Sequence, residues 1–255
     1  MRERLYLFDT TLRDGAQTNG VDFTLTDASL TGLGSDVLVS VKVANLTAGS
    51  GDNRFTVSGW TGGGSLVADG GSNTLIVTKD KDIVLSDSSL SSSDGLNMTI
   101  SGFATAFVTG GGSGNRYDVS GYTGSVTLDA GSDSLEIARG SASGTNKDAL
   151  IVADTLTNLS IVSGSILLAG EVTAVNKISL VASGAVVDGN DTTDADGNPI
   201  FVNNVTAAEL YISASGGIGS GNRLETQVRT FSAANVTSGD IELVNSQSLP
   251  GTLAI

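Results

Sequence analysis

From Phe23 to the C-terminus, apolar residues stand singly or in short runs, separated by polar residues and turn formers. Val, Ile and Leu alternate with Ser and Thr, and Gly, Asn and Asp follow at short intervals. This pattern is typical of many short strands joined by tight turns. Residues 1–22 differ, because an apolar run at 5–8 precedes a polar loop. We therefore predict a short strand there and an all-β region over residues 23–255.

The all-β region contains internal repeats. Segment 24–30 recurs at 84–90, segment 53–62 at 115–124, and segment 71–75 at 131–135. The offsets are 60, 62 and 60 residues, so residues 23–140 hold two copies of a unit of about 60 residues. Trp60 and Tyr122 occupy equivalent positions of the two copies. We expect matched packing or a shared face for these two aromatic residues rather than a sugar-binding pair.

Each large repeat divides further. Turn-forming residues recur every 18–24 positions, at Asn53, Asn73, Asn97, Asn115 and Asp133. A unit of about 20 residues is too small to bury its own apolar face, so it must stack on its neighbours. We therefore predict a parallel β-solenoid (β-helix) with rungs of about 20 residues, and keep a β-sandwich as the alternative.

The C-terminal part follows a related pattern. Residues 204–212 are echoed at 235–243, an offset of 31. We predict that residues 141–255 continue the solenoid with repeats of about 20–31 residues, interrupted by an acidic insertion at 188–198.

The amino-acid sequences of these repeats resemble those of the repeats in large bacterial filamentous haemagglutinin-like surface exoproteins. The resemblance covers about residues 23–255 and is carried by segments 23–32, 53–62, 68–77, 126–135, 186–198, 203–226 and 233–249. It implies a secreted β-helical stalk on the cell surface that acts in adhesion, with a host-cell, matrix or glycan surface as partner. Residues 1–17 contain no apolar stretch of signal-peptide length, so we expect an internal piece of a longer protein.

Residues 1–22 resemble a different family, the N-terminus of citramalate synthase and 2-isopropylmalate synthase. The motif LRDG at 12–15 carries the resemblance. It implies that Arg13 stabilises an enolate and that Asp14 binds a divalent metal, with Gln17 nearby, in a cytoplasmic acyltransferase that joins acetyl-CoA to a 2-oxo acid. An enolate oxygen needs a fixed cation, and a hard metal prefers carboxylate oxygen.

The chain departs from that family beyond the motif. Ala28 stands where the family has a lysine, and the chain has no histidine for the family's His-x-His metal ligands. The family's barrel also needs about 250 residues of alternating strand and helix. We interpret residues 1–22 as a displaced fragment, and the whole chain as chimeric.

The amino-acid composition excludes several classes of functional site and of binding partner. The chain has no Cys and no His, which removes disulfides, zinc-thiolate sites and Ser-His-Asp catalysis. Lys and Arg number 13 against 27 Asp and Glu, a net charge of −14, which opposes binding to nucleic acid or anionic lipid. No apolar run reaches the roughly 18 residues of a membrane helix, so we expect no membrane insertion.

Acidic segments raise the question of calcium. Segments 48–55, 71–75 and 131–135 approximate a calcium-binding nonapeptide, but Asn53 and Asn73 replace its aspartate, so we predict structural turns. Residues 188–198 hold four carboxylates without EF-hand spacing, so we predict a solvated insertion, with calcium as the weaker alternative.

We assign no catalytic residue. Asp129, Asp133 and Glu136 are candidate glycosidase carboxylates, but their repeat equivalents Asp69, Asn73 and Ile76 are not all acidic. The sequence therefore predicts a non-catalytic adhesin scaffold without a cofactor, and the acyltransferase with Arg13 and Asp14 is the alternative.

Overall fold

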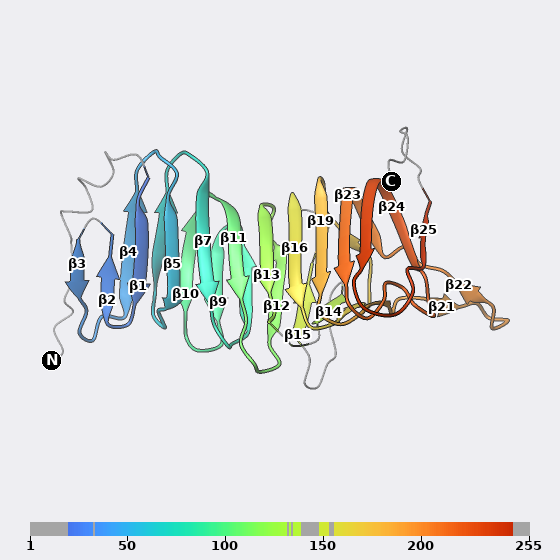
Figure 1. Cartoon of the computed structure of the whole chain (residues 1–255). Helices are drawn as coiled ribbons and strands as arrows, with labels where there is room; N and C mark the ends of the chain where they lie inside the picture. The colour runs from blue at the N-terminus through green and yellow to red at the C-terminus, as the bar shows by residue number, and fades with distance from the viewer. Residues whose placement is uncertain are drawn as a thin grey trace.

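Alternating residues give each strand one buried and one outward face. In β5 (Arg54–Gly59), Phe55 and Val57 are fully buried, whereas Arg54 is exposed. The structure is a computed structural model that describes residues 20–32, 34–131, 133, 135–138, 148–152 and 156–246. The described residues contain no helix, and their two large sheets are mostly parallel (Figure 1). The predicted all-β class is confirmed.

The larger sheet has 13 strands that lie side by side along an elongated molecule (Figure 1). In spatial order it contains β25 (Leu243–Asn245), β24 (Leu224–Asn235), β23 (Val205–Ala214), β19 (Lys177–Ala182), β16 (Asn158–Ser163), β13 (Ser125–Asp129), β11 (Phe103–Thr109), β7 (Asn73–Thr78), β5, β1 (Asp22–Thr26), β2 (Ser29–Thr31) and β3 (Ser35–Val37), with β18 (Val172–Thr173) paired to β23.

The second sheet has ten strands. In spatial order it contains β20 (Val186–Asp188), β17 (Ile166–Leu168), β14 (Leu135–Ala138), β15 (Asp148–Ile151), β12 (Arg116–Gly121), β8 (Ile83–Ser86), β9 (Ser89–Ser92), β10 (Asn97–Ser101), β6 (Gly63–Ala68) and β4 (Val43–Ala48). A separate hairpin pairs β21 (Thr192–Thr193) with β22 (Pro199–Ile200).

One apolar core joins the two large sheets. It contains inward side chains of both, such as Phe55 and Leu75 from the larger sheet and Leu66 and Tyr117 from the smaller. Near the N-terminal end, the rings of Phe23 and Phe55 stack at 4.9 Å, and Phe55 meets Phe103 edge-on at 5.3 Å. Aromatic contacts of this kind add to the burial of the rings.

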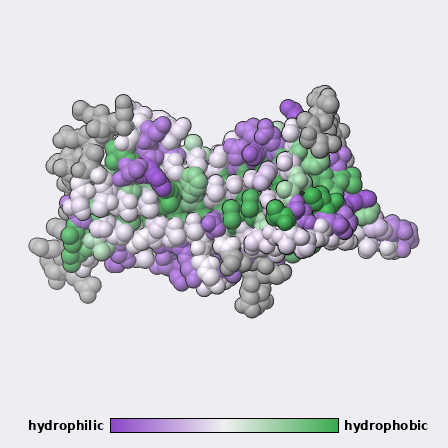
Figure 2. All heavy atoms as spheres, in the orientation of Figure 1, coloured by the Kyte–Doolittle hydropathy of each residue, from purple (hydrophilic) through white to green (hydrophobic). Residues whose placement is uncertain are grey.

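The outer surface in Figure 2 is mostly polar or neutral, with apolar areas toward the C-terminal half. Exposed apolar side chains on that part of the larger sheet include Val162, Tyr211 and Val244. Single exposed apolar residues of this kind are ordinary on protein surfaces.

The two copies of the large repeat share an equivalent pair of hydrogen bonds. The Asp27 carboxylate accepts hydrogen bonds from the backbone N and the hydroxyl of Thr61, at 2.8 and 2.7 Å. The carboxylate of Asp87 accepts the same pair from Thr123, both at 2.9 Å. Trp60 and Tyr122, which precede the two threonines, are both fully buried. The predicted matched packing of these aromatic residues is confirmed.

The two copies nevertheless occupy opposite sheets. In the first copy β1, β5 and β7 belong to the larger sheet and β6 to the smaller. Their equivalents β8, β12 and β14 belong to the smaller sheet, and β13 belongs to the larger. A shift of one repeat therefore exchanges the two sheets.

Neighbouring parallel strands are separated along the chain by one of two intervals. Leu75 lies opposite Phe55, which is 20 residues before it, whereas Ala106 lies opposite Leu75, which is 31 residues before it. Some longer spacings contain additional strands, such as the antiparallel set β8, β9 and β10. The similar segments 204–212 and 235–243 do not pair with each other in the sheet, because Val205 pairs with Thr226 rather than with Val236. The intervening β24 supplies the nearer partner.

Candidate metal centre

The chain leaves the two large sheets after β20. Residues 189–204 form an excursion that carries the β21–β22 hairpin, at the far end of the molecule from the N-terminus (Figure 1). Asp194 closes the hairpin turn, because its Oδ1 accepts hydrogen bonds from the backbone N of Asp196 and of Asn198. Asp194 and Asp196 are exposed, as a solvated insertion predicts.

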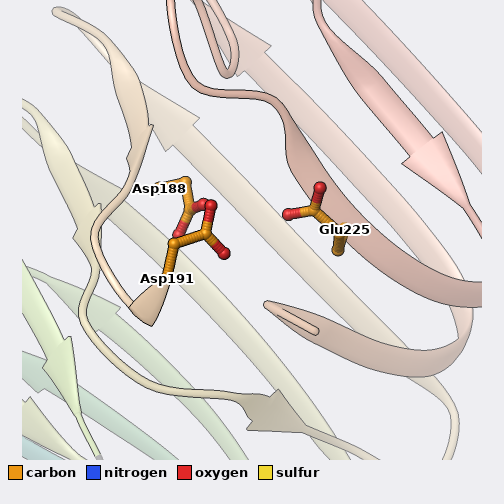
Figure 3. Close-up of side chains that lie close together, drawn as sticks. All are labelled: Asp188, Asp191 and Glu225. Atoms are coloured by element: carbon orange, nitrogen blue, oxygen red, sulfur yellow. The ribbon is translucent and has the colours of Figure 1, made fainter. Parts of the chain in front are cut away.

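The other two acids of this segment turn inward. Asp188 ends β20 and is 5% exposed, and Asp191 is partly buried. Both lie beside Glu225 of β24, and one carboxylate oxygen from each residue lies within 4.8 Å of the others (Figure 3). The prediction of a wholly solvated insertion is therefore wrong for Asp188, because the end of β20 anchors it to the packed part of the molecule.

Amide groups hold the two aspartates in place. Asp188 Oδ1 accepts hydrogen bonds from Asn204 Nδ2 at 2.7 Å and from the backbone N of Asn190 at 3.0 Å. Its Oδ2 accepts one from Asn222 Nδ2 at 3.0 Å, and Asp191 Oδ1 accepts one from the backbone N of Val202 at 2.9 Å. Both carboxylates are thus oriented before any ligand arrives.

Glu225 is only partly satisfied. It is 9% exposed, and its Oε1 accepts a hydrogen bond from Arg223 Nε at 2.8 Å. The Arg223 guanidinium also lies over the Phe201 ring, 4.2 Å from its centroid. Glu225 Oε2 is buried and has no hydrogen-bond partner among the described residues.

The cluster is electrostatically strained. Burial raises the pKa of Asp188 above its ordinary value, and the neighbouring Asp191 carboxylate raises it further, although hydrogen bonds from Asn190 and Asn204 act in the opposite direction. Like charges held together in a partly buried place favour uptake of a proton or a cation. Three carboxylates without nitrogen or sulfur ligands suit a hard cation such as calcium or magnesium.

The sequence pointed to part of this cluster. Residues 188–198 stood out as acidic, but Glu225 lies far beyond them in the chain and carries no local signal. Pairing of β24 with β23, in which Val205 lies opposite Thr226, brings Glu225 into place.

Two other segments with calcium-like sequences, 48–55 and 71–75, are turns held by asparagine side chains, whereas residues 132 and 134 of the third lie outside the described residues. Asn53 and Asn73 are buried, and Asn73 Oδ1 accepts hydrogen bonds from the backbone N and the side-chain Nδ2 of Asn53, both at 2.9 Å. Asn53 Nδ2 also donates to the carbonyl of Gly49 at 2.9 Å. These contacts satisfy backbone groups at the turns, as predicted for structural asparagines.

The candidate glycosidase acids are divided between the two large sheets and the segment that joins them. Asp129 lies on β13 of the larger sheet, and Glu136 lies on β14 of the smaller. Asp129 Oδ1 accepts a hydrogen bond from the backbone N of Gly131, and Asp133 lies in the turn between the two strands. Arg13, Asp14 and Gln17, the residues of the alternative acyltransferase site, lie outside the described residues.

Asp148 is a separate buried acid. It is fully buried at the start of β15, and its Oδ1 accepts a hydrogen bond from the backbone N of Asn115 at 2.7 Å. Burial raises the pKa of Asp148 to about 6, and the charges of Asp133 and Asp80 contribute to the rise. The folded protein therefore holds this proton to a higher pH than the unfolded chain does.

Replacement of Asp148 by asparagine is expected to stabilise the protein near neutral pH. Because the folded-state pKa is raised, stability falls as pH rises from the ordinary value of 3.8 to about 6, and the loss persists above that. We expect Asp148→Asn to raise the free energy of unfolding by about 1–2 kcal/mol at pH 7.5 and to leave it unchanged at pH 3.5. Urea unfolding at the two pH values measures this, with the exposed Asp69→Asn as control. An equal effect at both pH values would contradict the assignment.

Compared with known proteins, the chain matches no family model, no curated protein and no solved structure. Among the described residues, no helix is long and apolar enough to cross a membrane.

Proposed function

We propose that residues 23–255 form a parallel β-solenoid with rungs of about 20 residues, some of them lengthened by inserted strands. The chain alternates between the two large sheets, as in the run β4, β5, β6, β7 and β8. Successive strands of one sheet pair in parallel and in register, for example Asn45 with Ser65 and Asn158 with Lys177. Stacking of this kind satisfies the backbone of each rung with that of the next.

On this scaffold we propose a non-catalytic role in adhesion, as a fragment of a large bacterial surface protein of the filamentous haemagglutinin-like kind. The observation that carries the proposal is the continuous ladder of the larger sheet, in which hydrogen-bonded strands succeed one another from β1 to β25. A rod built this way holds weak contact surfaces away from the cell and presents many copies of them. Host-cell, matrix or glycan surfaces are the proposed partners.

The outer face of the larger sheet offers a surface for such contacts. A shallow hollow of about 230 Å³ lies over β13, β16 and β19. The residues that line it include Ser125, Thr127, Asn158, Ser160, Lys177 and Ser179, which bring hydroxyl, amide and ammonium groups to the hollow. These groups both donate and accept hydrogen bonds, which suits a glycan or another polar surface.

Attachment of coated beads tests the adhesive role. Beads carrying the full chain are expected to be retained on cultured epithelial monolayers several-fold more than beads carrying serum albumin, and more weakly when Asn158 and Lys177 are both replaced by alanine. Retention equal to that of albumin beads would overturn the adhesive role.

A condensation assay tests the competing acyltransferase. The full chain is incubated with acetyl-CoA, pyruvate and manganese, and release of free CoA is measured. No turnover is expected, and turnover abolished by Arg13→Ala would establish the enzyme in place of the scaffold.

A further inference from the structure

The cluster of Asp188, Asp191 and Glu225 carries more negative charge than its protein surroundings compensate. Three carboxylates lie close to one another, and the one basic side chain bonded to them among the described residues, Arg223, donates to Glu225 Oε1 and stacks on Phe201. Even with Arg223 counted, two negative charges remain uncompensated. A buried charge without a partner is costly, so the folded state favours a ligand that neutralises the cluster.

Glu225 points independently to a ligand. Its Oε2 is buried and has no hydrogen-bond partner among the described residues, and the residue is held near the start of β24 with 9% of its surface exposed. Figure 3 shows the Glu225 carboxylate directed toward the two aspartates, which lie on the segment facing it. Buried polar atoms in native proteins normally have a partner, and a bound ion can serve as that partner where no protein group does.

The hydrogen bonds to the aspartates leave room for a metal. Each carboxylate oxygen has two lone pairs. Asn190 and Asn204 use both on Asp188 Oδ1, whereas Asn222 uses only one on Asp188 Oδ2 and Val202 only one on Asp191 Oδ1. Oxygens bound to one calcium ion at about 2.3–2.6 Å can be up to about 5 Å apart, and the oxygens of the cluster lie within 4.8 Å of one another. Calcium also accepts irregular oxygen sites more readily than magnesium, which requires near-octahedral geometry.

We propose that Asp188, Asp191 and Glu225 bind one calcium ion, which fastens the excursion at residues 189–204 to the beginning of β24. The ion joins ligands from the end of β20, from the excursion and from β24, so it ties together segments that are distant in sequence. Calcium binding thereby stabilises the C-terminal part of the molecule, since an ion that binds only the folded state raises its stability.

Calorimetry and thermal unfolding of the full chain test this proposal. After removal of metals with EDTA and dialysis, calcium chloride alone is titrated into the protein, and magnesium chloride alone into a second sample. We expect one calcium ion per chain with a dissociation constant in the micromolar to millimolar range, and weaker binding of magnesium. Saturating calcium is expected to raise Tm by about 5 °C or more.

Variants locate the ion. Glu225→Gln and Asp191→Asn keep the shape of the side chains, and each is expected to weaken calcium binding at least tenfold and to remove the rise in Tm. Asp196→Asn is the matched control, because Asp196 lies in the same acidic segment but is exposed and outside the cluster. It is expected to bind calcium as the unaltered chain does.

Several results would overturn the site. One is the absence of saturable calcium binding by the unaltered chain together with an unchanged Tm, in which case a proton shared by the aspartates neutralises the cluster. Equal weakening by Asp196→Asn and Glu225→Gln would indicate diffuse attraction to the acidic segment. Tighter binding of magnesium than of calcium would refute the choice of ion. Calcium binding by the unaltered chain is measured directly, so the proposal is tested even if one of the variants fails to fold.

Discussion

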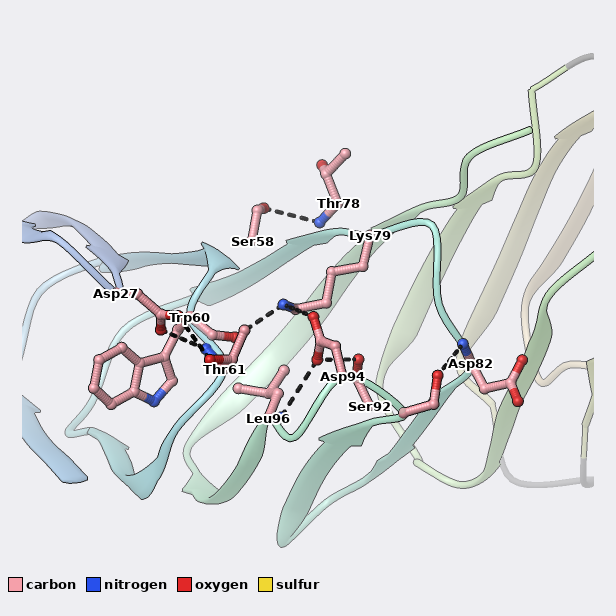
Figure 4. Close-up of polar contacts among 11 residues, drawn as sticks. Asp27, Ser58, Trp60, Thr61, Thr78, Lys79, Asp82, Ser92, Asp94 and Leu96 are labelled. Atoms are coloured by element: carbon pink, nitrogen blue, oxygen red, sulfur yellow. Dashed lines mark hydrogen bonds and ion pairs between the residues drawn. The ribbon is translucent and has the colours of Figure 1, made fainter. Parts of the chain in front are cut away.

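Replacement of Lys79 by methionine is expected to lower the free energy of unfolding by about 3 kcal/mol and Tm by roughly 6–12 °C. The Lys79 side chain is 4% exposed, and its Nζ donates to Asp94 Oδ2 at 2.7 Å and to the carbonyl of Trp60 at 2.9 Å (Figure 4). Methionine fills the space of the stem but leaves the Asp94 carboxylate and a buried carbonyl without their partner. Loss of one member of a buried pair is costly for this reason. Urea and thermal unfolding measure the change.

Matched variants separate the ion pair from general effects of charge. Lys81→Met removes an equally charged but exposed side chain and is expected to change stability by less than about 0.5 kcal/mol. The double variant Lys79→Met, Asp94→Leu removes both charges and is expected to be more stable than Lys79→Met alone. If the double variant is no more stable than the single one, the buried pair is not the cause of the loss.

The pH dependence of the same pair has a defined sign. Burial acts to raise the pKa of Asp94, but the hydrogen bonds from Lys79 and Ser92 outweigh it and hold the pKa below its ordinary value of 3.8. The contribution of Asp94 is therefore complete above that value and is lost as the pH falls through the folded-state pKa. The difference between the unaltered chain and Lys79→Met is expected to shrink in acid.

Replacement of Gly64 by alanine is expected to lower the free energy of unfolding by about 2–5 kcal/mol. Gly64 lies in β6 with φ of +135°, which costs an ordinary L-residue about 1–2 kcal/mol. An added Cβ would also overlap the carbonyl oxygen of Ala44, its partner in β4. Because that oxygen belongs to the backbone, relief requires movement of a paired strand, which adds about 1–3 kcal/mol.

Two other glycines serve as controls for that substitution. Gly131 has φ of +67° but open space where a side chain would project, so Gly131→Ala is expected to lose only the conformational part, about 1–2 kcal/mol. Gly112 has neither restriction, and Gly112→Ala is expected to be neutral or stabilising by up to about 1 kcal/mol. Chemical unfolding of the three variants gives the order, and equal losses for Gly64→Ala and Gly131→Ala would show that the contact with Ala44 does not matter.

Local pattern was enough to predict the strands and much of their packing. Alternation around Phe55 and Val57 gives one apolar face per strand, and burial of that face fixes which way the strand is turned. The equivalence of Trp60 and Tyr122 predicted their equal packing, since a repeated sequence meets repeated surroundings. Asn53 and Asn73 could be predicted to stabilise turns, because a short amide side chain can form hydrogen bonds with backbone groups there.

The candidate metal cluster was only partly visible in the sequence. Asp188 and Asp191 belong to an evident acidic segment, but their environment differs from that of Asp194 and Asp196 a few residues away. Glu225 joins them because β24 pairs with β23 and places its first residues beside the end of β20. Proximity of this kind depends on the path of the chain between distant segments, which a local motif does not contain.

The all-β class, the large internal repeat and the inward face of most strands could be predicted from the order of residues, because these features depend on the alternation of neighbouring side chains. Three other features are visible only in the folded molecule: a shift of one repeat exchanges the two sheets, β15 lies between β12 and β14, and Val205 pairs with Thr226 rather than with Val236. Each of these features depends on which strands form backbone hydrogen bonds with one another. These hydrogen bonds join segments that are distant in sequence. Because many strands have similar apolar faces, the local pattern is compatible with more than one strand pairing.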